Sequence, residues 1–127
     1  MQTISILAYI IVAFVMIICD AAWLFFLWHF YSENIQLIQQ GTKVNICKLA
    51  IAPIYVIMYL SVIFIAIPLY PEYNVGAGTL VGGAIYGVYD LCMVLQFEDN
   101  NLLLAVFDTL WGMALFTGLT YLAISFS

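Results

Sequence analysis

Charge is scarce in this chain of 127 residues, and positive charge is the scarcest. The chain has two lysines, no arginine and one histidine against seven acidic residues, so that only 7% of its residues are charged. Soluble domains carry charge on about a quarter of their residues. So few charged side chains cannot cover a protein of this size in water, which excludes a soluble globular domain. Nucleic-acid binding is excluded too, because two lysines cannot neutralise a phosphate backbone.

Disorder and the common catalytic signatures are also missing. A chain that is 67% hydrophobic, with a mean hydropathy of +1.15, is the opposite of a disordered one. It has no HExxH, GxSxG or glycine-rich phosphate motif. Cys19, Cys47 and Cys92 lack metal-site spacing and are expected to be small buried side chains. The sequence therefore predicts no metal site and names no cofactor, and an enzyme is the less favoured class.

Long hydrophobic runs are what the chain does contain. A bilayer core about 30 Å thick needs about 20 apolar residues in a helix. Four runs reach that length without the alternation of a β-barrel, at residues 3–31, 46–70, 76–97 and 102–126. Because the links between them are short, the sequence predicts an all-α integral membrane protein, a four-helix up-down bundle that forms one domain over residues 1–127.

The ends and interruptions of these runs lead to further expectations. The first run lacks a basic leader and is too long for a signal peptide, so we expect a retained span. Pro68 and Pro71 are expected to stop the second helix, and Pro53 to kink it. Residues 98–101 are expected to turn the third helix into the fourth.

The lysines set the predicted orientation. Lys43 lies in the connection of residues 32–45, and Lys48 lies just inside the second span. The positive-inside rule therefore places this connection in the cytoplasm, with both termini and the turn at residues 71–74 outside.

The same connection has two interpretations. Ile35 and Ile38 share a helical face, which fits a short helix on the membrane surface that ends at Gly41. The connection fits equally well the frayed end of the first helix. The sequence does not choose between them.

Three carboxylates lie inside the predicted spans, where a charge costs about 3 kcal/mol or more. Asp20 lies past the middle of the first span toward the cytoplasm. Asp90 lies about two turns before the cytoplasmic end of the third span, and Asp108 about two turns after the cytoplasmic start of the fourth. Three acids at one depth on three helices predict a shared binding site.

The shared site has an electrostatic consequence. Three neighbouring carboxylates in a poor dielectric cannot all ionise without a cation among them. The chain has few cations of its own, so a proton, a metal ion or a cationic substrate would supply the balance. The alternative is structural, in which each protonated acid only bonds to a neighbouring helix.

Aromatic donors share helix faces with these acids. Trp23 and Trp111 each follow one of the acids by three residues. Tyr86 precedes Asp90 by about one turn, and Tyr89 adjoins it. Indole N–H and phenol O–H groups can satisfy buried carboxylate oxygens. The predicted binding residues are Asp20, Asp90, Asp108, Trp23, Trp111, Tyr86 and Tyr89.

Glycines are regularly spaced in the third span. Gly78 and Gly82 are four residues apart, as are Gly83 and Gly87. This spacing predicts a close approach of a neighbouring helix.

Four short motifs, in their order along the chain, resemble those of a known family. The chain contains Asp20-x-x-Trp23-Leu24, Phe30-Tyr31, Tyr86-x-x-Tyr89-Asp90-Leu91 and Asp108-x-x-Trp111-Gly112. It resembles, over its whole length, a family of small bacterial inner-membrane proteins with four predicted spans, catalogued as a domain of unknown function. The resemblance implies a four-helix fold in the bacterial inner membrane with the three acids as its hallmark, and it implies no established activity.

Three classes of function remain open. The first is a carrier or permeation protein for a proton, ion or cationic small molecule, whose small size favours a homodimer. The second is a membrane enzyme acting on a lipid or isoprenoid-like substrate, with paired carboxylates as acid and base. The third is an assembly subunit whose acids pair with basic groups of another membrane chain.

Overall fold

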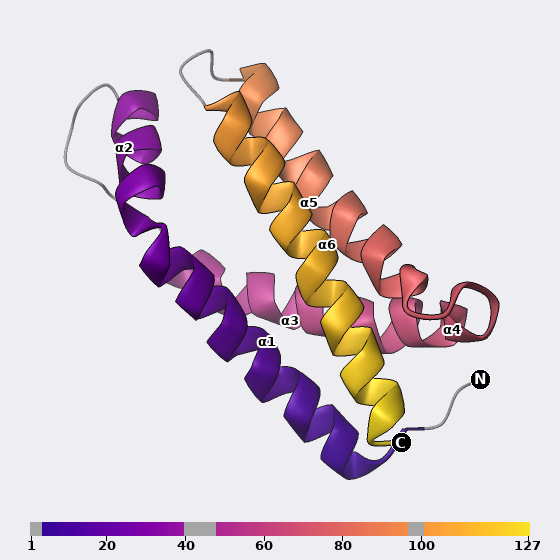
Figure 1. Cartoon of the computed structure of the whole chain (residues 1–127). Helices are drawn as coiled ribbons and strands as arrows, with labels where there is room; N and C mark the ends of the chain where they lie inside the picture. Colours follow the sequence, from indigo (N-terminus) through magenta and orange to yellow (C-terminus); the bar gives the residue numbers. More distant parts are fainter. Residues whose placement is uncertain (1–3, 40–47, 97–100) are drawn as a thin grey trace.

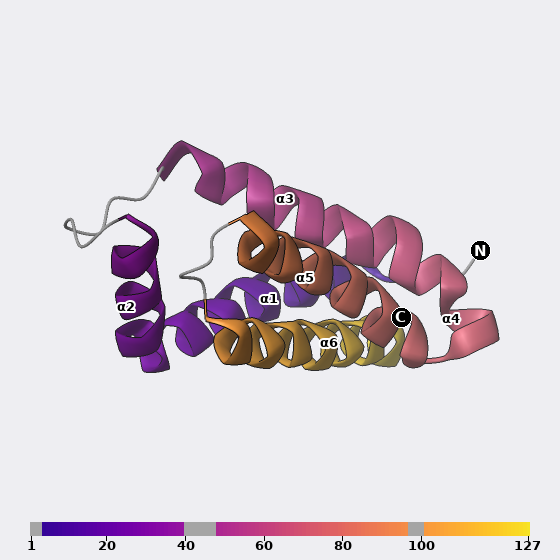
Figure 2. The same cartoon turned by 90° about the horizontal axis from the view of Figure 1, so that it is seen from above.

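The chain folds into an antiparallel bundle of helices, in a computed structural model that describes residues 4–39, 48–96 and 101–127 (Figure 1). Viewed from above, the long helical segments alternate in direction (Figure 2), and the second of them crosses the others at an angle (Figure 1). Four of them are long and apolar enough to cross a membrane, namely Ile6–Phe26, Lys48–Tyr73, Gly76–Gln96 and Leu102–Ser125. The predicted all-α class with four spans is confirmed.

The first span ends earlier than its hydropathy predicts. Helix α1 covers Ile6–Phe26, and α2 covers Trp28–Ile38 and points away from it (Figure 1). The change of direction occurs at Leu27, just before the sequence becomes polar. The expectation of one span through residue 31 is therefore wrong. The structure has a separate short helix here, and its predicted end at Gly41 lies outside the described residues.

The second span is a composite helix that passes through two prolines. The prediction that Pro68 and Pro71 stop it is wrong, because the helix continues to Tyr73. Pro68 lies at the start of a new α-helical segment, where a missing N–H costs little. Asn74, at a φ of 53°, ends the span. Its parts are η1 (Lys48–Ala50), α3 (Ile51–Ser61), the π-helical turn η2 (Val62–Ala66) and α4 (Ile67–Tyr73).

Pro53 lies in the first turn of α3 instead of in the middle of a long helix. Ala50 caps that helix and a 3₁₀ turn precedes it. The N–H groups of a first turn have no partner within the helix, so a proline there removes no hydrogen bond. The expected kink at Pro53 is therefore wrong, and the irregular turn of this span is η2 instead.

The third and fourth spans follow the sequence closely. Helix α5 covers Gly76–Gln96 and α6 covers Leu102–Ser125. The Asn101 side chain accepts a hydrogen bond from the Leu104 N–H and caps α6. Of the turn expected at residues 98–101, all but Asn101 lies outside the described residues.

Glycines allow α5 and α6 to pack almost backbone to backbone. A Cβ added at Gly82 would overlap the backbone oxygen of Gly112, and one added at Gly78 would overlap that of Phe116. At Gly112 an added Cβ would meet the ring of Tyr86. The close approach predicted from the spacing of Gly78 and Gly82 is confirmed.

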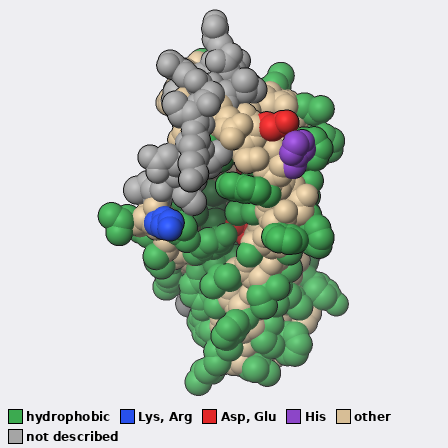
Figure 3. All heavy atoms as spheres, turned by 90° about the vertical axis from the view of Figure 1, so that its left-hand side faces the viewer, with side chains coloured by type: hydrophobic (Ala, Val, Ile, Leu, Met, Phe, Trp, Pro, Cys, Tyr) green, Lys and Arg blue, Asp and Glu red, His purple; other side chains and the backbone are tan. Residues whose placement is uncertain are grey.

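The hydrophobic core lies in the half of the bundle nearer the two termini. Phe116 and Leu119 of α6 are buried there against Val12 and Met16 of α1. One face of the molecule is hydrophobic over its lower half, with the histidine and an acidic side chain together in its upper part (Figure 3). Large apolar side chains on all four spans point outward, as a lipid-facing surface requires. The buried acids Asp20 and Asp90 are found in the other half, whereas the buried Thr120 lies in the core half.

Candidate functional site

Asp20 links all four spans through its carboxylate. It lies on α1 and is 8% exposed. Tyr55 of α3 donates to one oxygen at 2.6 Å, and Tyr86 of α5 donates to the other at 3.0 Å. Trp111 of α6 donates its indole N–H at 3.2 Å. Each of the other three spans therefore supplies one donor, so this acid has the contacts of a structural anchor.

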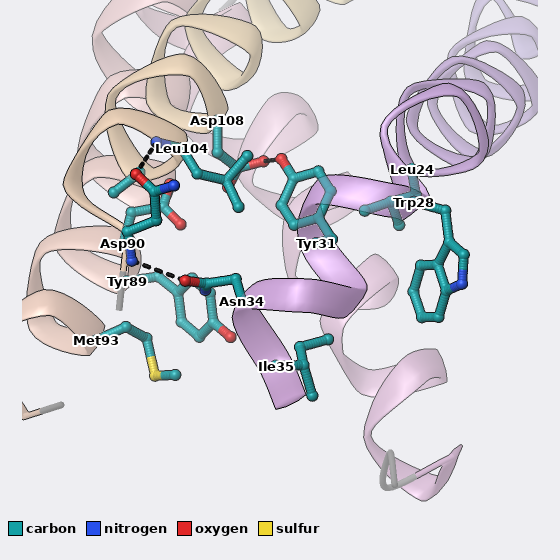
Figure 4. Close-up of a pocket in the computed structure, with 12 residues that line it drawn as sticks. Leu24, Trp28, Tyr31, Asn34, Ile35, Tyr89, Asp90, Met93, Leu104 and Asp108 are labelled. Atoms are coloured by element: carbon teal, nitrogen blue, oxygen red, sulfur yellow. Dashed lines mark hydrogen bonds between the residues drawn. The ribbon is translucent and has the colours of Figure 1, made fainter. Parts of the chain in front are cut away.

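Asp108 belongs to a second group of contacts, which ties α2 to α6. The Tyr31 hydroxyl on α2 points toward Asp108 and donates to it at 2.5 Å (Figure 4). That hydroxyl accepts a hydrogen bond from the Trp23 indole at 2.8 Å. Burial raises the pKa of the Tyr31 hydroxyl, and its bond to Asp108 raises the pKa further. Tyr31 therefore keeps its proton and acts as a donor.

Asp90 on α5 lines the same cavity as Asp108 on α6. It is 7% exposed, and it accepts a hydrogen bond from the hydroxyl of Thr109 at 3.3 Å. That hydroxyl also donates to the Ala105 carbonyl at 2.9 Å, so the contact with Asp90 is the longer of the two. Asp90 and Asp108 are thus an acid pair with fewer donors than Asp20.

Two stacked indoles lie between the groups of Asp20 and Asp108. The rings of Trp23 and Trp111 are parallel within 3°, with centroids 4.7 Å apart. Trp111 donates to Asp20, whereas Trp23 donates to Tyr31. The stack joins the two groups mechanically, but an indole N–H only donates, so it offers no proton path between them.

A cavity of about 260 Å³ adjoins the acid pair. It is bounded by α2 on one side and by α5 and α6 on the other (Figure 4). None of its described lining residues is basic, and most are apolar or aromatic. They are Leu24, Trp28, Tyr31, Asn34, Ile35, Tyr89, Asp90, Met93, Asn101, Leu104, Ala105 and Asp108.

The structure divides the predicted site residues into two sets. Asp90, Asp108 and the largely exposed Tyr89 line the cavity, whereas Asp20 does not. Tyr86 and Trp111 contact Asp20, and Trp23 contacts the Asp108 group. Within residues 4–39, 48–96 and 101–127, no three acidic, histidine or cysteine side chains gather as metal ligands. The three acids therefore belong to one network, but they do not surround one point.

Sequence reasoning missed three of the contacts. Tyr55 and Thr109 were not predicted, and Tyr31 was placed at the end of a span without a partner. A hydroxyl in an apolar span is a weak signal that could have drawn attention to Tyr55. Nothing in the sequence relates Tyr31 to Asp108, because that contact depends on the turn at Leu27.

Replacing Tyr31 with phenylalanine tests the contact between α2 and α6. The change removes a donor from Asp108 and an acceptor from Trp23. Side-chain hydrogen bonds in membrane proteins contribute about 0.6–1.7 kcal/mol each, so we expect unfolding to become easier by about 1–3 kcal/mol. Unfolding in mixed micelles measures this loss. Tyr121→Phe, at an exposed position on α6, is the control, and an equal loss in both variants would contradict the contact.

These features define a class of protein, a polytopic membrane protein with four apolar helices and a carboxylate network inside the bundle. Residues 5–125 match the family described as "Predicted membrane protein (DUF2177)", and the chain belongs to that family. No curated protein and no solved structure gives a significant match to the chain. The predicted membership of a membrane family of unknown function is confirmed.

Proposed function

We propose that this protein is a carrier or permeation protein that binds a proton or a small cation at Asp90 and Asp108. One observation carries the proposal. Asp90 and Asp108 line one cavity whose described walls offer no basic side chain to neutralise them. Asp20 has a different role in this proposal, because its three donors satisfy it within the protein.

Coulomb repulsion explains how such a pair would work. Two neighbouring carboxylates in a medium of low dielectric constant do not both ionise unless a positive charge lies between them. The pair therefore holds one proton when the cavity contains no other cation. A cation that enters the cavity replaces that proton, so binding and proton release are coupled. This exchange is the elementary step of a proton-linked carrier.

The walls of the cavity suit a small cation. Tyr31 and Tyr89 are aromatic side chains in the lining, which also contains Asn34. Aromatic faces attract cations. The Asn34 amide oxygen accepts a hydrogen bond from the Asn101 N–H at 2.7 Å and so holds α2 beside the start of α6. The volume of about 260 Å³ is enough for a hydrated ion or a small organic ammonium group.

The proposal includes an orientation. We place the protein in the bacterial inner membrane, with the connection of residues 32–45 in the cytoplasm and both termini outside. The cavity then lies on the cytoplasmic side, next to α2. The packed hydrophobic core lies between the acids and the outside. The alternative is that a partner neutralises Asp90 and Asp108. This partner would be a second copy of the chain or another membrane subunit that inserts a basic side chain into the cavity.

Proton release on cation binding tests the proposal. The full-length protein in nanodiscs, in weak buffer, is titrated separately with sodium, potassium and methylammonium chloride while a pH dye follows released protons. We expect at least one of these cations to release about one proton per chain. Asp90→Asn and Asp108→Asn are each expected to abolish the release, because the remaining acid no longer has an ionised neighbour.

Glu72→Gln is the matched control for this titration. It removes an exposed carboxylate on α4, in the half of the bundle that holds the hydrophobic core, and should leave the release unchanged. The proposal is wrong if the folded wild-type protein releases no proton with any of the three cations. A stoichiometric basic partner that co-purifies with such an inactive protein would favour the assembly subunit instead.

A further inference from the structure

We infer that α3 is the moving element of this bundle, and that it swings about the π-helical turn η2 while α4 stays in place. The inference rests on the proposed function, since it supplies the motion by which the buried acids would become accessible from a second side. Its evidence is separate, because it comes from the packing of the second span and not from the acid pair.

The two halves of the second span are packed very differently. Of the eleven residues of α3, only Met58 is buried. The next part of the span buries Val62, Ala66 and Ile67, which belong to the hydrophobic core. The π-helical turn and α4 pack against α5 and α6. In contrast, α3 packs against α1 and reaches the core through Met58, Tyr55 and Tyr59.

Open volume lies on both sides of α3. A hollow of about 420 Å³ lies between α3 and part of α1 and is lined in part by Ala21, Phe25 and Tyr55. A second hollow of about 350 Å³ lies between α3 and α5, next to Met58 and Tyr86. Both hollows are open grooves at the surface of the bundle, so the other helices do not pack closely against α3 there and it has room to move sideways.

Polar contacts hold α3 in its present position. Tyr55 donates to Asp20 at 2.6 Å, and Tyr59 donates to the backbone oxygen of Tyr9 at 3.2 Å. Both partners lie on α1. Such bonds contribute about 0.6–1.7 kcal/mol each in a membrane, so α3 can leave and return without unfolding the bundle.

The π-helical turn η2, which follows α3 in the chain, has the features of a hinge. The N–H of Ile67 bonds to the oxygen of Val62, five residues back, where a regular α-helix would use the residue four back. Pro68 follows at once and supplies no N–H to the helical ladder. π-helical turns and prolines are common causes of helix bending, and here both lie at the boundary between the loose and the anchored halves.

Movement of α3 would change the surroundings of Asp20. Tyr55 would leave with its helix, while Tyr86 and Trp111 would keep their bonds to the carboxylate. The two hollows beside α3 would merge next to an acid that has lost a donor. Access to the carboxylate network would then come from the α3 side, in addition to the cavity near α2.

Amide hydrogen exchange of the full-length protein in nanodiscs tests this inference, with Tyr55→Phe as the variant. Loss of the bond to Asp20 should raise exchange in α3 by about three- to fifteen-fold, which corresponds to one such bond. Exchange in η2 and α4 should stay at the wild-type level. Tyr73→Phe, at an exposed position on α4, is the matched control and should change neither segment.

Two results would overturn the inference. One is unchanged exchange in α3 of Tyr55→Phe, and the other is an equal rise in all four spans, which would mean general destabilisation. The wild-type protein gives a second test that does not depend on the folding of the variant. In the wild type, the amides of α3 should exchange faster than those of α4. Proton release by Asp90 and Asp108 is measured separately, so failure of the proposed function and failure of this motion are distinguishable.

Discussion

Replacing Asp20 with alanine is expected to lower the free energy of unfolding by about 2–5 kcal/mol, the sum of three bonds of about 0.6–1.7 kcal/mol each. The change leaves Tyr55, Tyr86 and Trp111 with donors directed at an empty position. A buried donor without an acceptor loses its hydration and gains nothing in return. Because each donor belongs to a different span, the loss should affect the whole bundle.

The experiment compares two substitutions at Asp20 in mixed micelles. Asp20→Asn keeps one acceptor oxygen and should lose less stability than Asp20→Ala. Glu72→Ala removes an exposed carboxylate and should change stability by less than about 0.5 kcal/mol, as is usual for surface positions. If Asp20→Ala is as stable as Glu72→Ala, the carboxylate is not the anchor that its contacts indicate.

Gly82→Ala is the second substitution with a large expected effect, about 2–4 kcal/mol of lost stability. The new methyl group would overlap the backbone oxygen of Gly112, and a backbone atom cannot turn aside as a side chain can. Overpacking of this kind typically costs about 1–3 kcal/mol. It should cost more here because α5 and α6 must separate along their contact, which also moves Tyr86.

Gly118→Ala is the matched control on α6, because its new methyl group would have no atom within 4 Å apart from the adjacent residues and backbone of its own helix. Alanine favours a helix over glycine by about 1 kcal/mol, so this variant should be as stable as the wild type or more so. Unfolding in mixed micelles ranks the two variants. A Gly82→Ala protein as stable as Gly118→Ala would show that α5 and α6 do not pack as closely as described.

The three buried acids of this protein have two kinds of surroundings that their sequence positions do not reveal. Asp20 has a donor from each neighbouring span and resembles a structural cross-link. Asp90 and Asp108 lie beside one cavity, where we propose a proton or cation site. The structural alternative considered for all three acids therefore fits the contacts of Asp20, whereas binding at Asp90 and Asp108 stays a proposal.

The sequence by itself determined the class of protein and most of its spans. Its hydrophobic length and its lack of charge leave a bundle of membrane helices as the structure that satisfies the backbone. The third and fourth spans were predicted to within one residue of α5 and α6, because polar residues or turns bound their apolar runs. The glycine spacing on α5 likewise predicted close packing, since a backbone can approach a helix only where side chains are missing.

Only the tertiary structure decided the rest, because it depends on which helix faces meet. No proline or glycine marks the turn at Leu27 in the sequence, yet this turn brings Tyr31 into contact with Asp108. Pro68 fits into a continuous span because a π-helical turn precedes it, which hydropathy cannot indicate. The sequence predicted that the three acids lie at one depth. It could not predict which helix face each acid occupies, and the structure places Asp90 and Asp108 at one cavity and Asp20 among donors of the other three spans.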